Sequence, residues 1–365
     1  MGKNFFINLG TILAGIGGLF LFLKSRLSTG DIQKSKTDIK PCKRPFYYCE
    51  IHRNGEVSPC CPDFLKYESS PGNIGKEDFD KIWNGKIFTD LRQRVLKGDY
   101  SMCNRDICCF YEPCSVSDIP PDYKKGPKDF TMSYDFECNY HCITCRDSVK
   151  VNTAEEMDFY EIILLPKIIK AAKNAETIGL LGAGDPLCSR HTRHLMRELV
   201  KNYPDIKIRL STNGFLMNEK NLTELEIQNN IQSVSVSVDA VNGETYKKII
   251  RTDGFDTVIK NLEMMAEWKK QGRIEWMTIN FVVHLLNYKE MPEFVKLAQK
   301  LDVTALFTTY RPWQSAEFYK KYDEVAVFEP ANEHYCELAE ILHDPVFKDK
   351  KHCLLEPRLL DIANS

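Results

Sequence analysis

The chain has 365 residues, of which 43% are hydrophobic and 27% charged, so it is long enough for one large domain and a smaller one. The formal net charge is −2, and acidic and basic residues are spread along the chain, which gives no basic surface for a nucleic acid. Fourteen cysteines are the unusual feature. A disulfide framework is typical of small secreted domains, whereas this long Lys/Glu/Ile-rich chain indicates reduced cysteines and metal sites.

An uncharged run of 19 residues, Phe5–Leu23, lies near the N-terminus and is about long enough to cross a bilayer core. A cleaved signal peptide is the main alternative, but only one basic residue, Lys3, precedes the run and no small-x-small cleavage motif follows it. More basic residues follow the run, from Lys24 onward, so the positive-inside rule places the body of the protein in the cytoplasm. The sequence predicts a membrane anchor over residues 1–24 and a polar linker over 25–41.

A cysteine-rich module follows over residues 42–127, and eight of the fourteen cysteines lie in it. Two short runs, Phe46–His52 and Glu56–Cys60, flank an Asn54-Gly55 pair. This pattern predicts a β-hairpin, because Asn-Gly tolerates the positive φ angles of a tight turn. The spacing of apolar residues then predicts one amphipathic helix over Asp78–Leu96.

From residue 130 onward the pattern changes to alternating strands and helices. The predicted strands are 130–136, 177–182, 206–211, 232–238, 276–283 and 303–308. The predicted helices are 156–173, 190–202, 219–228, 255–270 and 288–300. This alternation implies an α/β fold with a parallel sheet and right-handed crossovers, and six repeats suit either an open doubly wound sheet or an incomplete (β/α) barrel.

Polar motifs stand at the ends of the first four predicted strands. Cys138–Cys145 follows the first strand, Gly182–Pro186 the second and Ser211–Gly214 the third, while Ser237–Asp239 closes the fourth. The carboxyl ends of parallel strands meet at one edge of the sheet, where α/β folds bind their ligands. The four motifs therefore predict one ligand-binding edge.

The first of these motifs, Cys138-Asn-Tyr-His-Cys142-Ile-Thr-Cys145, carries three thiols spaced four and three residues apart. Three thiolates bind one metal cluster without completing its ligand set, so one iron of a four-iron cluster stays open. Such a site favours catalysis, because structural sites normally fill their last coordination position. The alternative is a set of buried thiols or a zinc site that takes His141 as a further ligand.

The cysteine spacing and the motifs after strands two to four resemble the radical S-adenosylmethionine (SAM) superfamily, over roughly residues 130–310. The resemblance implies a partial (β/α)6 TIM-like barrel and a 4Fe–4S cluster on Cys138, Cys142 and Cys145, with SAM bound at the open iron. One electron would then cleave SAM to methionine and a 5′-deoxyadenosyl radical, which abstracts a hydrogen atom from a substrate.

The resemblance also implies contacts with SAM at the strand ends. In chain order, these are Gly184 and Asp185 at the methionine amino group, Ser211 and Asn213 near the ribose and, as weaker candidates, Ser237 and Asp239. Two positions depart from the family pattern. Thr144 stands where an aromatic residue is frequent, with Tyr140 as the nearest ring, and Asp185 is one methylene shorter than the usual Glu.

The cysteine-rich module resembles the SPASM/Twitch auxiliary-cluster module over about residues 41–114. The motifs that carry this resemblance are Cys42-x-x-Pro45, Gly55-x4-Cys60-Cys61-Pro62, Gly72-Asn73-Ile74, Ile82-Trp83-Asn84 and Cys103-x4-Cys108. It implies a second 4Fe–4S cluster with ligands Cys42, Cys60, Cys103 and Cys108, and with Cys61 and Cys109 as adjacent alternates. A four-cysteine zinc site would use the same residues. In that family the module usually follows the barrel, whereas here it precedes it.

The remaining cysteines and the histidines carry weaker signals. Cys49 alternates with Tyr47 and Ile51 along a predicted strand and is interpreted as a packed thiol, while Cys114 stays undecided. Four histidines are interpreted as core or surface residues: His52, His191, His194 and His284.

Together these features predict a membrane-anchored radical SAM enzyme whose catalytic part is cytoplasmic, with a core over residues 128–310 and an extension over 311–365. The second cluster would accept an electron from a substrate radical, for a net two-electron oxidation, or bind the substrate directly. The implied partners are a peptide, protein or carbohydrate substrate and an electron donor such as flavodoxin or ferredoxin. The alternative is a non-catalytic membrane-tethered iron–sulfur or zinc protein that serves as an electron carrier or scaffold.

Overall fold

The computed structural model describes residues 40–61, 64–66, 70–105, 108, 110–181, 184–312 and 317–365. The predicted membrane anchor, Phe5–Leu23, lies outside this described part of the chain. Within the described part, no helix is long and apolar enough to cross a membrane. The described residues form two compact units, drawn from Met1–Phe136 with Asn152–Arg209 and from Glu137–Val151 with Leu210–Ser365.

The first unit contains a sheet in which β2 (Val57–Ser58), β1 (Tyr48–His52), β3 (Asp129–Ser133) and β4 (Thr177–Leu180) are neighbours in that order. Strands β1 and β2 are antiparallel, whereas β1 pairs with β3 and β3 with β4 in parallel. Strand β5 (Lys207–Thr212) begins in this unit and ends in the second. The pairing of β1 with β3 makes the hairpin part of the parallel sheet, which the sequence pattern does not reveal.

The predicted hairpin is confirmed between β1 and β2. Asn54 and Gly55 have φ angles of 63° and 81°, the positive pair that the turn requires. A Cβ atom on Gly55 would also lie 3.0 Å from the side-chain oxygen of Asn73, so the turn has little room for another residue. Asn73 holds the turn from outside by donating from Nδ2 to the carbonyl of Asn54 at 2.7 Å.

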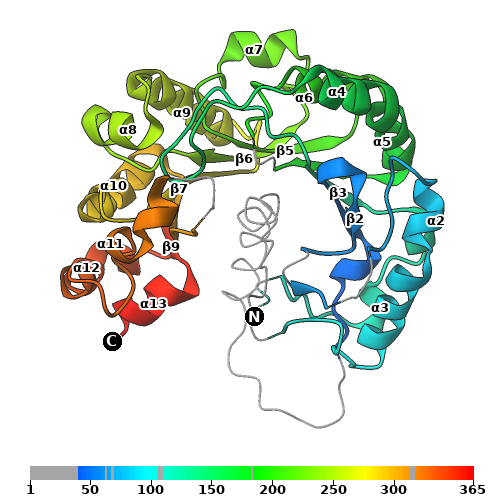
Figure 1. Ribbon diagram of the computed structural model, residues 1–365, viewed down its shortest axis with the longest axis horizontal. Coiled ribbons are helices and arrows are strands. Elements are labelled where there is room, and N and C mark those ends of the chain that lie inside the picture. The colour runs from blue at the N-terminus through cyan, green and yellow to red at the C-terminus, as the bar shows by residue number, and fades with distance from the viewer. Residues whose placement is uncertain are drawn as a thin grey trace. The chain divides into compact units, whose positions relative to one another are not determined.

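The helices of the first unit lie along one side of its strands (Figure 1). They are α2 (Phe79–Trp83), α3 (Lys86–Leu96), α4 (Ala154–Asp158), the π-helix η6 (Phe159–Leu164), α5 (Leu165–Ala171) and α6 (Arg190–Asn202). Short 3-10 turns are η1 (Arg44–Phe46), η2 (Arg53–Gly55), η4 (Val116–Asp118), η5 (Tyr123–Lys125) and η7 (Ala172–Asn174). A capping box begins α4, since the Thr153 hydroxyl accepts from the Glu156 amide and the Glu156 carboxylate accepts from the Thr153 amide.

The prediction of one continuous helix over Asp78–Leu96 is wrong, because the chain breaks it into α2 and α3 at Asn84-Gly85. Gly85 is the N-cap of α3 and has extended backbone angles. A Cβ atom there would lie 2.9 Å from the carbonyl oxygen of Lys81, so the close turn favours glycine. The apolar stripe continues across the break, which explains why periodicity alone reads it as one helix.

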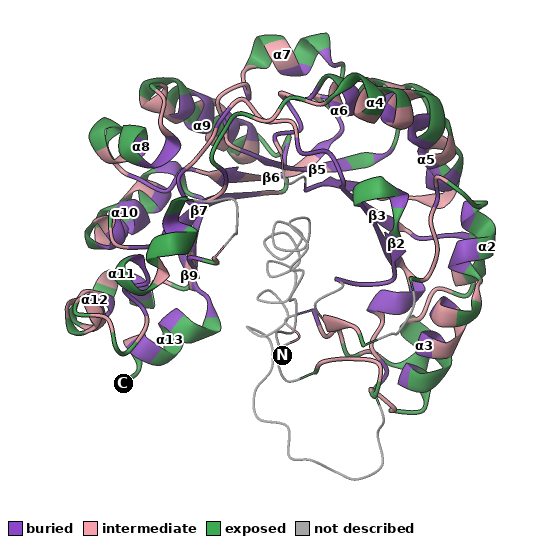
Figure 2. Cartoon of the chain, viewed as in Figure 1, coloured by how far each residue is buried: buried purple, intermediate pink, exposed green. Residues whose placement is uncertain are grey.

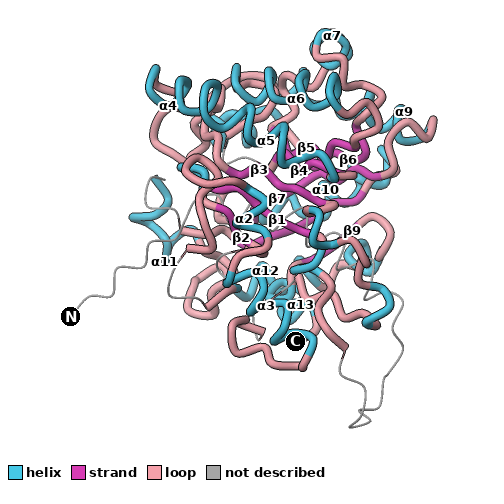
Figure 3. Tube along the Cα trace, turned by 90° about the vertical axis from the view of Figure 1, so that its right-hand side faces the viewer, coloured by secondary structure: helices cyan, strands magenta, loops and turns pink. Residues whose placement is uncertain are grey.

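The second unit contains the parallel strands β6 (Ile231–Ser237), β7 (Trp276–Val283), β8 (Thr304–Thr309) and β9 (Cys353–Leu355), again as neighbours in that order. The first three agree closely with the predicted strands. Strand β9 was not predicted, and it extends the sheet from within the C-terminal residues 311–365. Figure 3 shows the strands of each unit in magenta among the connecting helices.

The helices of the second unit are α7 (Glu219–Glu224), α8 (Gly243–Ile250), α9 (Phe255–Lys270), α10 (Met291–Leu301), α11 (Tyr322–Val325), α12 (Tyr335–Leu342) and α13 (Pro357–Ala363), with 3-10 turns η8 (Tyr288–Glu290), η9 (Glu317–Lys321) and η10 (Pro345–Lys348). Helix α8 was not predicted. It begins at Asn242, whose side chain accepts from the Thr245 amide. Buried aromatic contacts pack α10 on the sheet, with the Phe281 and Phe294 rings 4.8 Å apart. Figure 2 shows this burial along the strands.

The observed class is therefore α/β with mainly parallel strands and crossover helices, as the alternation predicts.

Candidate functional site

The three cysteines of the triplet, Cys138, Cys142 and Cys145, lie on one closed loop of the second unit. The loop is closed at its base by a bridge in which the Cys138 amide donates to the Lys150 carbonyl at 3.0 Å. A tight turn then brings the other two together, because the Cys145 amide donates to the Cys142 carbonyl at 2.9 Å. All three thiols are half-buried. The loop therefore gathers the whole set from eight consecutive residues.

Two of the three sulfur atoms of the triplet receive hydrogen bonds. The Tyr140 amide donates to Cys138 Sγ and Arg146 Nε to Cys145 Sγ, each at 3.4 Å. Burial raises the pKa of Cys142, and the neighbouring Cys145 and Cys138 thiols raise it further. Such a set gives up its protons to a bound metal, because thiolates are the ligating form. Three thiolates with a guanidinium and an amide donating to them fit an iron–sulfur cluster.

Helix α8 and the segment around Phe215 support the triplet loop. The Ile143 amide donates to the Ile249 carbonyl at 2.9 Å, and the Tyr140 hydroxyl lies 3.3 Å from that of Tyr246. The Tyr140 ring is buried and contacts the Phe215 ring at 5.8 Å. Tyr140 thus fixes the loop as a core residue, while Thr144, at the position where the family often has an aromatic residue, is buried.

Asn213 lies beside the triplet at the carboxyl end of β5. Its Nδ2 donates to Asn139 Oδ1 at 2.9 Å and lies 3.9 Å from Cys138 Sγ, while its Oδ1 accepts from the Phe215 amide. Ser211 is buried two residues earlier on the same strand. The structure therefore brings one predicted ribose-segment residue into contact with a predicted cluster ligand.

Asp239 follows β6, and its negative charge is one of the causes that raise the pKa of Cys142. Its Oδ1 accepts from the Val282 amide at 2.7 Å, and its backbone has a φ of 64°. Burial raises the pKa of this carboxyl to about 7. Ser237, its neighbour on β6, is half-buried and stands opposite Asn280 of β7. Of these two weaker candidates, Asp239 has the stronger connection to the triplet.

Gly184 and Asp185 belong to the first unit, after β4. The Gly184 amide donates to the Asp135 carbonyl at 3.1 Å. Asp185 is buried, and its Oδ1 accepts from the amides of Leu187 and Cys188 at 3.0 and 3.2 Å. One carboxylate oxygen of Asp185 thus shapes the turn that leads into α6.

Asp135, which the sequence analysis did not select, organises this part of the first unit. Its carboxylate accepts from Asn152 Nδ2 and Thr192 Oγ1, each at 2.9 Å, and from Ser189 Oγ. It lines a small pocket together with Asp185, between the end of β3 and the start of α6. A signal was present in the sequence, because an acid stands at the end of the strand that leads to the triplet.

A chain of hydrogen bonds runs beside Asp135 from the surface into the core. His194 and His191 each place Nδ1 on the carboxylate of Glu161, at 2.6 and 2.9 Å. The Nε2 atom of the fully buried His191 then lies 2.7 Å from the Tyr134 hydroxyl. Burial lowers the pKa of His191, which favours a neutral ring that accepts from Tyr134. Both histidines are structural, as predicted, and they hold the segment that carries Asp135.

The four predicted ligands of the second cluster, Cys42, Cys60, Cys103 and Cys108, line one pocket of the first unit. They come from separate segments, and aromatic and aliphatic side chains, including Phe110 and Leu91, form the walls. Burial raises the pKa of Cys42 to about 12 and that of Cys103 to about 11, so both are protonated thiols until a metal displaces the proton.

Two arginines also line the four-cysteine pocket, Arg44 and Arg105. Arg44 is buried, and its Nε atom has no hydrogen-bond partner in the described part of the chain. A cluster held by four thiolates is anionic, and a buried guanidinium with a spare donor compensates such a charge. The donor set and the orphaned Nε atom both fit an iron–sulfur cluster. Across the described ranges, no three His, Cys, Asp or Glu side chains converge on the position of a single metal ion.

Cys49, Cys61 and Cys114 are not among the described residues that line this pocket. Cys49 is buried, as expected of a packed thiol. Burial raises its pKa, and the positive charge of Arg92 in α3 partly opposes this increase. Cys61 is buried in an apolar cluster with Cys60 and Phe110, and Cys109 lies outside the described residues. Cys114 donates from Sγ to the Pro41 carbonyl at 3.4 Å.

Family models match both cysteine-bearing regions. Residues 136–298 match the radical SAM superfamily, and residues 42–115 match the SPASM iron–sulfur cluster-binding domain. The order of the two matches agrees with the order predicted from the sequence.

Curated relatives match part of the chain. A probable GTP 3′,8-cyclase of Saccharolobus islandicus is 30% identical over 184 residues, which cover 49% of this chain and 55% of the relative. The molybdenum cofactor biosynthesis protein moc-5 of Caenorhabditis elegans is 26% identical over 206 residues, 54% of this chain and 33% of the relative. The chain thus spans about half the length of the cyclase and a third of moc-5.

Solved structures with similar folds include Streptococcus suis SuiB bound to S-adenosylmethionine, with 17% identity and a TM-score of 0.44 over 74% of this chain and 55% of that chain. Another is coproporphyrinogen III oxidase (HemN) from Escherichia coli, with 14% identity and a TM-score of 0.42 over 60% of this chain and 53% of that chain.

Proposed function

The chain belongs to the radical SAM superfamily as an enzyme with a SPASM domain ahead of its radical SAM domain, and from this premise we propose that it oxidises a peptide, protein or carbohydrate. The family implies SAM and iron–sulfur clusters as cofactors. The observation that carries the proposal is the closed triplet loop, in which two of the three thiols, Cys138 and Cys145, receive hydrogen bonds and the motif supplies no fourth cysteine. The predicted alternative of a non-catalytic carrier is less well supported, because the family match is to a class of enzymes.

Cys138, Cys142 and Cys145 would hold a 4Fe–4S cluster in this proposal. When bound, that cluster supplies the electron that splits SAM into methionine and a 5′-deoxyadenosyl radical. Arg146 donates to Cys145 Sγ and so stabilises the thiolate charge. Tyr140 keeps the loop packed and limits access of water.

The residues proposed to contact SAM are Gly184, Asp185, Ser211, Asn213, Ser237 and Asp239. We add Asp135 as a positioning residue, because it holds the Gly184 amide through its carbonyl and the start of α6 through its carboxylate. Asn213, in contact with Asn139 and near Cys138 Sγ, supports the expected ribose segment beside the triplet. Burial raises the carboxyl pKa of Asp239 to about 7, so this residue can hold or release a proton near neutral pH.

The pocket formed by Cys42, Cys60, Cys103 and Cys108 would hold the second cluster. The origin of its four cysteines in three chain segments and its buried arginine support a permanently closed, four-ligand site. A cluster bound there would supply a one-electron acceptor for the proposed oxidation. Direct binding of substrate stays the other role that the sequence predicts.

A nucleoside triphosphate is a second candidate substrate, because the curated relatives include proteins named as probable GTP 3′,8-cyclases. The shared region covers about half of each chain. The similarity therefore supports radical SAM chemistry in the core more strongly than it supports GTP as the substrate.

The remaining parts of the proposal extend the predicted organisation. We retain residues 42–127 as the auxiliary domain, 128–310 as the radical SAM core with a partial (β/α)6 barrel, and 311–365 as an extension. The parallel strands and crossover helices within each unit support the barrel. Residues 1–24 would anchor the enzyme in the membrane with its catalytic part in the cytoplasm, where flavodoxin or ferredoxin supplies electrons.

Anaerobic reconstitution tests the proposed function. Two cubane clusters correspond to about eight irons per chain. With dithionite and SAM, the reconstituted protein should form 5′-deoxyadenosine, which chromatography detects. A protein that binds zinc in place of iron, or that holds a full complement of iron and leaves SAM intact, would contradict the proposal.

A further inference from the structure

Strands β1 and β3 alternate polar and apolar residues, yet both of their faces are buried. On one face lie Cys49 and Ile51 of β1 with Phe130 and Met132 of β3, opposite each other in register. This face meets the helices, since the Phe130 ring contacts the Phe79 ring of α2 at 5.2 Å. An apolar face covered by helices is the normal arrangement in an α/β fold.

The other face carries polar side chains, and we define it as the polar face. Its members pair across the strands as Tyr48 with Asp129, Glu50 with Thr131 and His52 with Ser133, and Arg209 of β5 joins them through an ion pair with Asp129. Tyr48, Glu50, His52, Thr131 and Ser133 are each no more than 2% exposed. Polar groups removed from water in this way need hydrogen-bond partners.

Several buried atoms of the polar face have no such partner among the residues that the structure describes. They are Glu50 Oε1, both ring nitrogens of His52, Thr131 Oγ1 and Arg209 Nε. His52 Nδ1 lies 3.7 Å from Glu50 Oε1, which is beyond hydrogen-bond distance. The Tyr48 hydroxyl satisfies only the other carboxylate oxygen, Oε2, at 2.9 Å. Leaving a buried charge without a partner is costly, so these atoms indicate a ligand that supplies the missing bonds.

The charges of the polar face select the kind of ligand. Arg209 forms an ion pair with Asp129. Arg44 Nη1 lies 3.6 Å from Glu112 Oε1, and Arg44 Cζ lies 3.6 Å from the centre of the Tyr48 ring. Among the described residues of the polar face, Glu50 is therefore the carboxylate without a cationic partner in hydrogen-bond contact. Such a site favours a cationic nitrogen and disfavours a triphosphate, whose negative charges would face Glu50 and Asp129.

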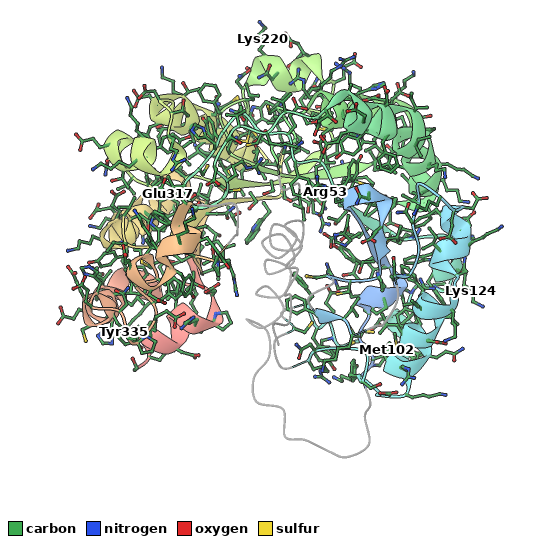
Figure 4. The ribbon with its side chains drawn as sticks, in the orientation of Figure 1. Arg53, Met102, Lys124, Lys220, Glu317 and Tyr335 are labelled. Carbon is green, nitrogen blue, oxygen red and sulfur yellow. The ribbon has the colours of Figure 1, made fainter. Side chains whose placement is uncertain are left out.

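The polar face also adjoins the four-cysteine pocket through β1. Arg44, which lines that pocket, stacks on the Tyr48 ring, and Tyr48 donates to Glu50. At the other end of the strand lies Arg53, which Figure 4 labels. Its guanidinium lies 3.6 Å from Glu156 and 5.1 Å from the ring of Phe136, the residue just before the triplet loop. Strand β1 thus runs from the second-cluster pocket to the segment that precedes the triplet.

We propose that the polar face is a substrate subsite in which Glu50 binds an ammonium or guanidinium group of the substrate. His52 and Arg209 then donate hydrogen bonds to oxygen atoms of the same molecule. This assignment rests on the proposed radical SAM function and narrows its substrate to an amine-bearing carbohydrate or peptide. Gly179 of β4, opposite Thr131, leaves space for Arg209 to cross the sheet, since a Cβ atom there would lie 3.2 Å from Arg209 Nη2.

Two matched pairs of small molecules test the subsite on the reconstituted full chain. The first pair is glucosamine and glucose, and the second is Nα-acetyl-lysine amide and Nα-acetyl-norleucine amide; within each pair only the first member carries a cationic nitrogen. Ligand-observed NMR titration should show millimolar binding of a cationic member and much weaker binding of its neutral partner. The pair that responds distinguishes a carbohydrate from a peptide source.

Glu50→Gln keeps the size of the side chain and removes its charge, so it should weaken the cationic member about tenfold to a hundredfold. Glu56→Gln is the matched control, because Glu56 is exposed on the same hairpin. Glu50→Asp, which keeps the charge, should retain more of the binding than Glu50→Gln and confirms that the charge is responsible.

Equal binding to wild type and Glu50→Gln, equal binding of charged and neutral partners, or no binding of either cationic member would overturn the subsite. A further contrary result concerns GTP. If GTP binds to Glu50→Gln more tightly than either cationic probe binds to wild type, the subsite assignment is also overturned. Formation of 5′-deoxyadenosine without added substrate is measured in parallel. If the wild-type protein does not cleave SAM, the proposed function is wrong. If it cleaves SAM but binds charged and neutral probes equally, only the subsite assignment is wrong.

Discussion

The triplet loop and the four-cysteine pocket both gather thiols, but they do so by different physical means. The triplet takes its three sulfurs from eight consecutive residues of the second unit, with an amide donor at Cys138 Sγ and a guanidinium donor at Cys145 Sγ. The pocket takes four sulfurs from separate segments of the first unit and surrounds them with apolar and aromatic walls and two arginines.

This difference concerns what each site needs in order to form. A loop closed by a single bridge, Cys138 to Lys150, needs little tertiary structure to bring its ligands together. The pocket exists only when η1, α3 and the loops around Cys60 and Cys103 have packed. A local, hydrogen-bonded ligand set suits a site that opens to a substrate, whereas a buried, complete set suits electron storage.

The largest effect is expected from Cys142→Ala. Loss of one of three ligands should abolish formation of 5′-deoxyadenosine and lower the iron content from about eight to about four per chain, because the pocket keeps its own cluster. Cys336→Ala is the control, since Cys336 is exposed on α12. Iron analysis and chromatography provide the two measurements, and retention of activity in Cys142→Ala would remove the triplet from the mechanism.

The double replacement Cys42→Ala with Cys60→Ala tests the other side of the comparison. It should also remove about half of the iron, yet SAM cleavage without substrate should fall by less than about tenfold, because the triplet ligands remain. Cys114→Ala, outside the pocket, serves as the control. A variant that loses all of its iron would show that the two sites do not form independently.

Asp135→Asn is expected to weaken SAM binding about tenfold to a hundredfold, since the amide nitrogen cannot accept the hydrogen bonds that Ser189, Thr192 and Asn152 donate to the carboxylate. The dissociation constant of SAM measures the effect, with the exposed Asp205→Asn as the control. Unchanged affinity in Asp135→Asn would mean that the β4 loop forms without this carboxylate.

The smallest effect concerns stability in the second unit. Burial lowers the pKa of His284 to about 3, below its unfolded value of 6.5, so its stabilising contribution is present above pH 6.5 and declines as the pH falls toward 3. Between pH 7.5 and 5.5, wild type should lose about 1.4 kcal/mol more unfolding free energy than His284→Asn. Urea denaturation of both proteins gives the difference, and parallel pH profiles would refute the linkage.

Local patterns predicted much of the fold. The Asn54-Gly55 turn, the full extent of β7 and the positions of α6 and α9 follow from turn chemistry and periodicity acting over a few residues. Local patterns did not predict the elements whose secondary structure depends on contacts with distant parts of the chain. Strand β9 is three residues long and is a strand only because β8 lies beside it, and Gly85 breaks a helix whose apolar stripe continues across it.

The candidate site divides in the same way. The cysteine spacings alone identified the triplet and the four pocket cysteines, because the chemistry of a metal ligand set is written in residue type and separation. The acid at the end of β3 was visible in the sequence, but the role of Asp135 was not, since its partners Asn152, Ser189 and Thr192 lie further along the chain.

The sequence by itself determined the chemistry of this protein, namely two groups of thiols and a run of polar strand ends. Only the tertiary structure decided that β1 pairs with β3 and so places Glu50 and His52 on a buried face. The reason is physical: a strand pattern specifies which residues share a face, but the register with a distant strand specifies what that face meets.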